Sequence, residues 1–339
     1  MLPRLHCQHG GKVMPVLSRV ASLALLGFGL ALSSAPSQAQ SLPAKPIRFI
    51  VPFGPGGSGD TLARLIGQHL SERIGQPVIA ENRMGAGGNI GADVVAKSEP
   101  DGTTLLMGAN YVTIAPSLYN RMNYDPIKDL APVTLVGSIP FVLVVNNTVP
   151  ARSVSELIAL AKAKPNEFAY ATPGLGTSTH LATELLKQQT GTEIRHVPYR
   201  ANPLAMTDVI GGQIQVFFDF VTTGGPQVKS GKVRGLATTG TKRSHVLPEL
   251  PTMIEAGVPN FEVSTWLAIY ARGGTPRPIV DRLHNEITAI LALPAVKERL
   301  TSLGYDIAAE GPDKLAAVMR SDTDLWASVI RKAGIAKID

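Results

Sequence analysis

The sequence predicts an α/β protein with a largely parallel sheet, folded as two lobes that face a cleft. The chain has 339 residues, enough for two domains of roughly 100–150 residues each. Segments with strand and helix patterns alternate along it, which favours an α/β fold. A strand, a glycine-rich turn and a helix near residues 47–70 recur near 168–190, which predicts the two lobes. With 44% hydrophobic and 17% charged residues, the composition excludes a disordered or fibrous protein.

The N-terminal residues predict a signal peptide. Arg4, Lys12 and Arg19 precede an apolar run from Val20 to Leu32, with no acidic residue among them. This run is too short for a transmembrane helix, which needs about 20 residues. Small residues at Ser37 and Ala39 fit a cleavage site, so residues 1–39 are expected to direct export to the periplasm and to be removed. An uncleaved anchor is the alternative.

Cleavage would change the composition of the chain. Removing 39 of 339 residues leaves 300, and the only cysteine, Cys7, is lost with them. The mature chain could form no disulfide bond. It would keep 29 of the 32 basic residues against 26 acidic ones, a net charge of +3. No cluster of basic residues predicts a nucleic-acid partner, but the mild positive balance is compatible with a small anionic ligand.

The elements of the first half follow from local patterns. Residues 47–51 form an apolar, buried strand, and residues 62–70 have apolar side chains at helical spacing within a helix expected at 61–74. Strands are expected at 77–80 and 104–107, with a helix at 91–96 between them. The apolar run at 141–145 predicts a further strand. Ser153 is expected to cap a helix that ends at Ala163, with Glu156 at the capping-box position.

The second half continues the same alternation. A strand at 168–171 leads through a glycine turn to a helix at 178–189. Strands are expected at 212–219, 233–238 and 266–270, and long helices at 278–291 and 313–333 complete the chain.

The first glycine loop joins the strand at 47–51 to the following helix. Gly54, Gly56 and Gly59 fit the G-x-G-x-x-G pattern of a dinucleotide site, and Glu81 follows the second strand. We reject a nicotinamide cofactor, because such cofactors are scarce outside the cytoplasm and the motif alone is weak. No cofactor is therefore expected. Glycines and a helix N-terminus can still bind an anion such as a carboxylate.

Asp60 at the end of this loop has two interpretations. It is a suitable N-cap for the helix at 61–74, which would make it a structural residue. Alternatively, its carboxylate receives an ammonium group or a water bound to the ligand.

The second glycine loop, residues 172–180, also follows a strand and opens a helix. It offers the hydroxyls of Thr177, Ser178 and Thr179 and the imidazole of His180. His180 is either a structural hydrogen-bonding residue in the first helical turn or a ligand contact. Two helix N-termini that favour anions, one in each lobe, could together hold a molecule with two carboxylates.

Seven motifs in order resemble the Bug-type receptors, the periplasmic substrate-binding proteins of tripartite tricarboxylate transporters. They span residues 46–60, 81–91, 100–108, 170–186, 197–200, 217–219 and 243–257, and the resemblance covers about residues 43–335. It implies the periplasmic binding protein fold of the second type, with mixed, mostly parallel sheets and a ligand cleft between two α/β lobes. The implied domains are residues 41–142 with 266–339, and residues 143–265, joined by crossing strands near 142–146 and 263–270.

The resemblance also implies where the ligand binds. In this family a carboxylate is held by the loop after the first strand and by a loop of the second lobe, largely through backbone amides and waters. The matching positions are Phe53, Gly56, Gly57, Ser58, Asp60 and Thr61, with Gly176, Thr177, Ser178 and His180. Tyr199 and Asp219 are expected on the second lobe's side of the cleft, and Asn110 follows the third strand.

The chain departs from the family pattern at several places. Ala201 and Asn202 stand where a glycine usually follows Val-Pro-Tyr-Arg, and Thr172, Pro173 and Thr177 stand where smaller residues are commoner. These departures bear on the identity of the ligand, which the sequence does not name.

The sequence favours a receptor over an enzyme. The histidines that remain after cleavage show no metal-ligand spacing, and no nucleophile is paired with a base in the sequence, so neither a metal nor a catalytic residue is predicted. The expected function is a monomeric periplasmic receptor that delivers a small carboxylate to a membrane transporter. The alternatives are a sensor that docks on a membrane signalling protein, and an exported enzyme acting on small acids.

Overall fold

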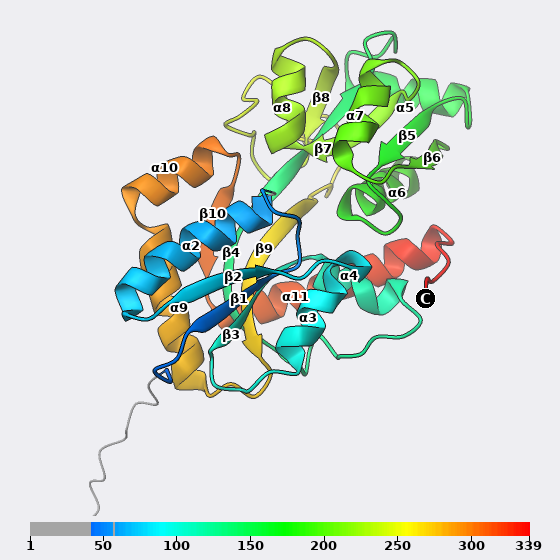
Figure 1. Cartoon of the computed structure of the whole chain (residues 1–339). Coiled ribbons are helices and arrows are strands. Elements are labelled where there is room, and N and C mark those ends of the chain that lie inside the picture. The colour runs from blue at the N-terminus through cyan, green and yellow to red at the C-terminus, as the bar shows by residue number, and fades with distance from the viewer. Residues whose placement is uncertain (1–41, 57) are drawn as a thin grey trace, which may run out of the picture. The chain divides into compact units, whose positions relative to one another are not determined.

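Figure 1 shows the computed structural model of the chain, which describes residues 42–56 and 58–339. Residues 42–339 form one compact unit. The predicted signal peptide, Cys7 and Gly57 lie outside the described residues. Within the described part, none of the helices combines the length and apolarity needed to cross a bilayer.

The first half of the sheet contains the N-terminal strands. Its members are β1 (Ile47–Val51), β2 (Val78–Asn82), β3 (Thr104–Ala109), β9 (Ser264–Arg272), β10 (Asp306–Glu310) and the start of β4 (Leu130–Val145). β1 pairs in parallel with β2 and β3. β9 lies antiparallel between β3 and β4, and β10 is antiparallel to β4. We call this half, with its helices, the first lobe.

The second half of the sheet begins where β4 changes partners. Residues Leu130 to Pro140 of β4 pair with β9, whereas Phe141 to Val145 pair with β7 (Val216–Phe220) and β8 (Arg234–Thr238). β5 (Ala169–Thr172) pairs in parallel with β7 and with β6 (Arg195–Pro198). We call this half, with its helices, the second lobe. β4 therefore runs through both lobes of an α/β fold.

The helices cover both lobes, as Figure 1 shows. In the first lobe they are α2 (Ser58–Ile74), the short 3₁₀ helix η1 (Ala86–Gly88), α3 (Asn89–Ala96), α4 (Tyr111–Leu118), α9 (Arg277–Leu291), α10 (Pro294–Ser302) and α11 (Pro312–Lys332). In the second lobe they are α5 (Val154–Ala163), α6 (Ser178–Thr190), α7 (Asn202–Ile210) and α8 (Val221–Lys229).

The alternation of β1 places its side chains in two layers of core. Phe49 belongs to a cluster with Leu62 of α2 and Ile287 of α9. Ile50 points to the other face and belongs to a cluster with Val95 of α3 and Leu315 of α11. This period of two is that of a strand buried on both faces.

α11 connects the cores of the two lobes. Its N-terminal Leu315 and Met319 pack in the first lobe. Its C-terminal Trp326, Val329 and Ile330 instead belong to a cluster with second-lobe residues of β5 and α6. One helix of 21 residues thus contributes to both hydrophobic cores.

Most predicted elements are present, but the expectation of a mostly parallel sheet is only partly correct. The parallel ladders lie at the two ends of the sheet, and the central ladders of β4 and β9 are antiparallel. The strand expected at 141–145 is the end of a strand of 16 residues. Pro132 interrupts its sequence pattern and sits at a shift in register, a position that tolerates a residue without an N–H group.

Helix starts and short elements differ most from the prediction. α2 begins at Ser58, so Asp60 lies in its first turn and is not the N-cap. The strand expected at 212–219 begins only at Val216. Seven elements of the described residues were not predicted, namely η1, α4, α7, α8, α10, β6 and β10. Ser153 does cap α5 and accepts a hydrogen bond from the Glu156 N–H.

Candidate functional site

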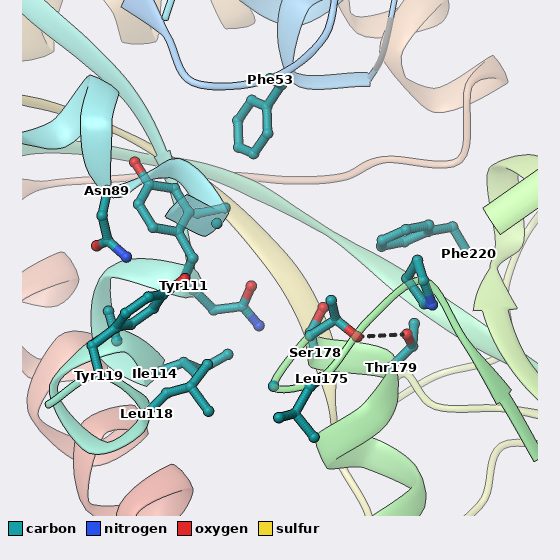
Figure 2. Close-up of a pocket in the computed structure, with 17 residues that line it drawn as sticks. Phe53, Asn89, Tyr111, Ile114, Leu118, Tyr119, Leu175, Ser178, Thr179 and Phe220 are labelled. Atoms are coloured by element: carbon teal, nitrogen blue, oxygen red, sulfur yellow. Dashed lines mark hydrogen bonds between the residues drawn. The ribbon is translucent and has the colours of Figure 1, made fainter. Parts of the chain in front are cut away.

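A cavity of about 210 Å³ opens between the two lobes (Figure 2). In the first lobe its described lining comes from the β1–α2 loop, η1, the start of α3 and the segment from the end of β3 through α4. In the second lobe it comes from the β5–α6 segment and the end of β7. First-lobe residues are Phe53, Gly87, Asn89, Ala109, Asn110, Tyr111, Ile114, Ala115, Leu118 and Tyr119. Second-lobe residues are Pro173, Leu175, Gly176, Thr177, Ser178, Thr179 and Phe220.

Helix N-termini from both lobes line this cavity. α4 begins at Tyr111 and α6 at Ser178, and both residues belong to the lining. Asn89, which begins α3, lines it as well. The N-terminal end of a helix carries a partial positive charge and free N–H groups. The cavity can therefore favour an anion without a cationic side chain.

None of the described residues that line the cavity has a charged side chain. Its polar groups are amides and hydroxyls, which can donate hydrogen bonds to a carboxylate. Among residues 42–56 and 58–339, no group of three or more His, Cys, Asp or Glu residues could hold a metal ion.

Two polar lining residues are anchored to the start of β9. The Asn110 Nδ2 of the first lobe donates a hydrogen bond of 3.2 Å to the Ser264 carbonyl. The hydroxyls of Ser178, from the second lobe, and Thr265 lie 2.9 Å apart. Ser264 pairs with Pro140, where β4 passes from one lobe to the other. Groups from both lobes thus meet at this crossing.

The second glycine loop lies against α4 of the first lobe. Gly176 has a φ of +71°, a conformation that favours glycine. A Cβ atom added to Gly176 would lie only 2.9 Å from Leu118 Cδ1. Gly176 therefore brings the loop of the second lobe into contact with Leu118 of the first lobe. Both residues line the cavity.

His180 holds this loop from behind. It is 2% exposed, and its Nδ1 accepts a hydrogen bond of 3.0 Å from the Gly176 N–H. Its ring stacks on His196, which stacks on Tyr170. Burial, with the nearby charges of His196 and Lys187, lowers the pKa of His180 to about 3. The imidazole is therefore neutral near pH 7 and can accept this bond.

Asp60 holds the first glycine loop in a similar way. Its buried carboxylate accepts hydrogen bonds from the Gly56 N–H at 2.9 Å, from Arg64 and from Asn82 Nδ2 at 2.8 Å. Burial acts to raise the pKa of Asp60, but these hydrogen bonds outweigh it and the pKa is lowered. Asn82 also donates to the Phe53 carbonyl. Asp60 thereby fixes the loop that presents Phe53 to the cavity.

The other predicted site residues are placed as follows. Phe53, Asn110, Gly176, Thr177 and Ser178 line the cavity, whereas Gly56, Ser58, Asp60, Thr61, His180, Tyr199 and Asp219 are not among its described lining residues.

Tyr199 and Asp219 make contacts within the second lobe. The Tyr199 hydroxyl donates a hydrogen bond of 2.6 Å to Asp208. Asp219 accepts from Asn202 Nδ2 at 2.6 Å and from the Phe220 N–H at 2.9 Å. Burial raises the pKa of Asp219 to about 6. Asp219 borders a separate hollow of about 480 Å³ beside α7 and α8.

Several lining residues were not predicted as site residues, among them Gly87, Asn89, Tyr111, Ile114, Leu118, Tyr119, Leu175 and Phe220. Two signals could have indicated some of them. Gly87 and Asn89 lie within the motif at 81–91, where residues 85–88 all have positive φ values. Tyr111, Ile114 and Leu118 belong to α4 and Tyr119 follows it; this helix was not predicted because Pro116 interrupts its pattern.

Comparison with known proteins gives concordant matches. The model of the tripartite tricarboxylate transporter family receptor matches residues 62–335. Protein BugT of Bordetella pertussis is 38% identical over 316 residues, which cover 92% of this chain and 97% of BugT. A protein encoded in the tcbD–tcbE intergenic region of Pseudomonas sp. strain P51 is 40% identical over 310 residues, covering 90% of this chain and 92% of that protein.

Solved structures of other binding proteins are also similar to this chain. Rpa4515 of R. palustris with adipate is 36% identical, with a TM-score of 0.77 over 88% of this chain and 100% of that one. The periplasmic binding protein BugD is 34% identical, with a TM-score of 0.74 over 87% and 100%. MatC of Rhodopseudomonas palustris with bound malate is 31% identical, with a TM-score of 0.73 over 85% and 99%.

Proposed function

Since the chain belongs to the tripartite tricarboxylate transporter receptor family, we propose that it is a periplasmic receptor that captures a small organic carboxylate and delivers it to a tripartite membrane transporter. The ligand would bind in the cavity between the lobes. The protein would act without catalysis and without a cofactor.

One observation carries this proposal. N-terminal residues of α4 in the first lobe and α6 in the second lobe line the same cavity, whose described lining has no charged side chain. A carboxylate at this point can accept hydrogen bonds from backbone N–H groups and hydroxyls of both lobes. The solved relatives with adipate and malate support a carboxylate as the ligand.

Different residues would have different roles. Asn110 and Ser178 would donate hydrogen bonds to the ligand, and Gly176 would allow the close approach of the loop. Thr177, whose hydroxyl donates to the Gly174 carbonyl, would hold this loop in shape at the cavity wall. Phe53 would form a wall of the cavity. Asp60, with Gly56, Ser58 and Thr61, would hold the Phe53 loop, and His180 would hold Gly176. Gly57 would belong to the same first loop.

Capture would proceed by closure of the lobes. We place the lobes at residues 41–142 with 266–339, and at residues 143–265, with a hinge near Pro140 where β4 changes partners. A ligand that bonds groups of both lobes binds the closed form better than the open form. It therefore shifts the population toward closure. The closed form is the state that a transporter would recognise.

The primary test is ligand binding by the purified mature protein. Native mass spectrometry detects any acid that co-purifies, and a thermal-shift screen compares organic acids with their uncharged amides. We expect at least one acid to raise the Tm while its amide does not. Stabilisation by NAD alone, or by no acid in a broad panel, would contradict the proposal.

Delivery and export need separate measurements. A strain that lacks this gene should lose uptake of the labelled acid, whereas unchanged uptake with an altered transcriptional response would identify a sensor. An acid recovered chemically intact after long incubation excludes turnover. N-terminal sequencing of the exported protein should start at Gln40 if the signal peptide is cleaved after Ala39.

A further inference from the structure

Aromatic side chains form two walls of the cavity. Phe53 packs edge-on against Tyr111, with ring centroids 6.1 Å apart and an interplanar angle of 81°. On the second lobe Phe220 packs against Phe141, with centroids 5.3 Å apart. Phe53, Tyr111 and Phe220 are only partly buried and lie around the cavity in Figure 2. These rings therefore leave aromatic surface available to a ligand from both lobes.

Aliphatic side chains complete the apolar surface. Ile114 and Leu118 of α4 and Leu175 of the second glycine loop line the same cavity (Figure 2). Leu175 is 42% exposed. Uncovered apolar surface that lines a concave site is typical of a binding pocket. Burying Leu175 and the aromatic faces against an apolar ligand would gain free energy, whereas burying them against hydroxyl or carboxylate groups would not.

The distribution of polar groups limits the number of charges on the ligand. Hydrogen-bond donors lie at three helix starts, around Asn89, Asn110 and Ser178. Across the described lining no Lys, Arg or His faces the ligand space. Each further carboxylate would have to leave water without a cationic partner, which costs free energy unless hydrogen bonds replace the lost hydration. One carboxylate can bind at the starts of α4 and α6, while the aromatic and aliphatic walls of the cavity fit an uncharged group.

Resting on the proposed function, we propose that the ligand is a monocarboxylate with an aromatic body. Its carboxylate binds at the N-termini of α4 and α6. Its ring lies between the aromatic walls and contacts Leu175.

Isothermal titration calorimetry tests this with benzoate, benzamide, adipate, malate and citrate. The protein is first freed of co-purified acid by unfolding in denaturant and refolding. We expect benzoate to bind more tightly than adipate, malate or citrate, and benzamide to bind at least tenfold more weakly than benzoate. Leu175→Ser should weaken benzoate binding by about tenfold or more, as expected for lost apolar contact in a pocket. Leu204→Ser is the matched control, because Leu204 is 54% exposed and lies outside the cavity lining.

The outcomes separate this inference from the function on which it rests. Tighter binding of adipate, malate or citrate than of benzoate would overturn the aromatic monocarboxylate and leave the carboxylate receptor standing. Equal loss of affinity in Leu175→Ser and Leu204→Ser would also overturn the inference. Benzamide binding as tightly as benzoate, or no binding by any acid, would contradict the carboxylate receptor itself.

Discussion

Replacing Gly176 by alanine should prevent full closure of the lobes around a ligand. Gly176 belongs to the second lobe, and its Cα faces Leu118 of α4 in the first lobe. An alanine Cβ would lie 2.9 Å from Leu118 Cδ1 and 3.1 Å from its Cγ, closer than carbon atoms pack. Because the two residues lie on different lobes, the proposed opening of the cleft would remove the clash.

The expected magnitude has two parts. An alanine with the φ of +71° found at Gly176 carries a backbone cost of about 1–2 kcal/mol, which lowers the free energy of unfolding. Overpacking against Leu118 costs about 1–3 kcal/mol more. In the proposed closure mechanism only the closed form contains this second cost, so it should reduce ligand affinity by about 5- to 150-fold.

A matched control separates the two parts. Gly191 ends α6 with a φ of +64°, and no atom lies within 4 Å of its added Cβ. Gly191→Ala should therefore lower stability to urea about as much as Gly176→Ala, without changing the affinity measured by calorimetry. Unchanged affinity in Gly176→Ala would refute the reasoning. So would a double-mutant cycle with Leu118→Ala that shows no coupling between positions 118 and 176.

Three further changes test the buried polar residues His180, Asp219 and Asp60. His180→Asn keeps an acceptor near the Nδ1 position, so this variant should bind ligand normally. His180→Gln does not keep it there and should lose about three- to tenfold in affinity. Equal affinities of the two variants in calorimetry would argue that His180 does not position Gly176. Burial raises the pKa of Asp219 to about 6, so the folded state loses stability relative to Asp219→Asn as the pH rises from 4 to 7. In urea titrations at pH 7, the free energy of unfolding of Asp219→Asn should exceed that of the unchanged protein by about 1–3 kcal/mol. At pH 4 the two values should be equal. A difference that does not change with pH would contradict a raised pKa of Asp219. Asp60→Ala leaves the Gly56 N–H and Asn82 without their acceptor and should lower the free energy of unfolding by about 1.5–3 kcal/mol. As a control, Asp281→Ala removes a partly exposed ion pair with Arg277 and should lower it by under about 1 kcal/mol. Equal losses in urea titrations would show that Asp60 does not stabilise the loop.

Local patterns in the sequence were sufficient for most regular elements. In a strand such as Ile47–Val51 successive side chains point to opposite faces, and in a helix such as the one at Leu62–Leu70 residues three or four apart share one face. Both patterns can be recognised from neighbouring residues alone. The cap at Ser153 depends on residues three apart. The motif order indicated the family, which the comparisons confirm. Such features are fixed by neighbours along the chain, and for that reason they can be read from it.

The lining of the cavity was decided by contacts between distant residues. Asn110, Thr177 and Ser178 were predicted, but Leu118 lies against Gly176 only because α4 and the second glycine loop meet across the lobes. Asp60 and His180 carry groups suited to binding a ligand. Both side chains instead accept hydrogen bonds from the backbone N–H groups of Gly56 and Gly176, which orients them toward the protein interior. Residue types therefore indicated the family and predicted a carboxylate ligand. Packing of segments far apart in sequence decided which side chains reach the cavity, because the free energy of those contacts depends on all their partners at once.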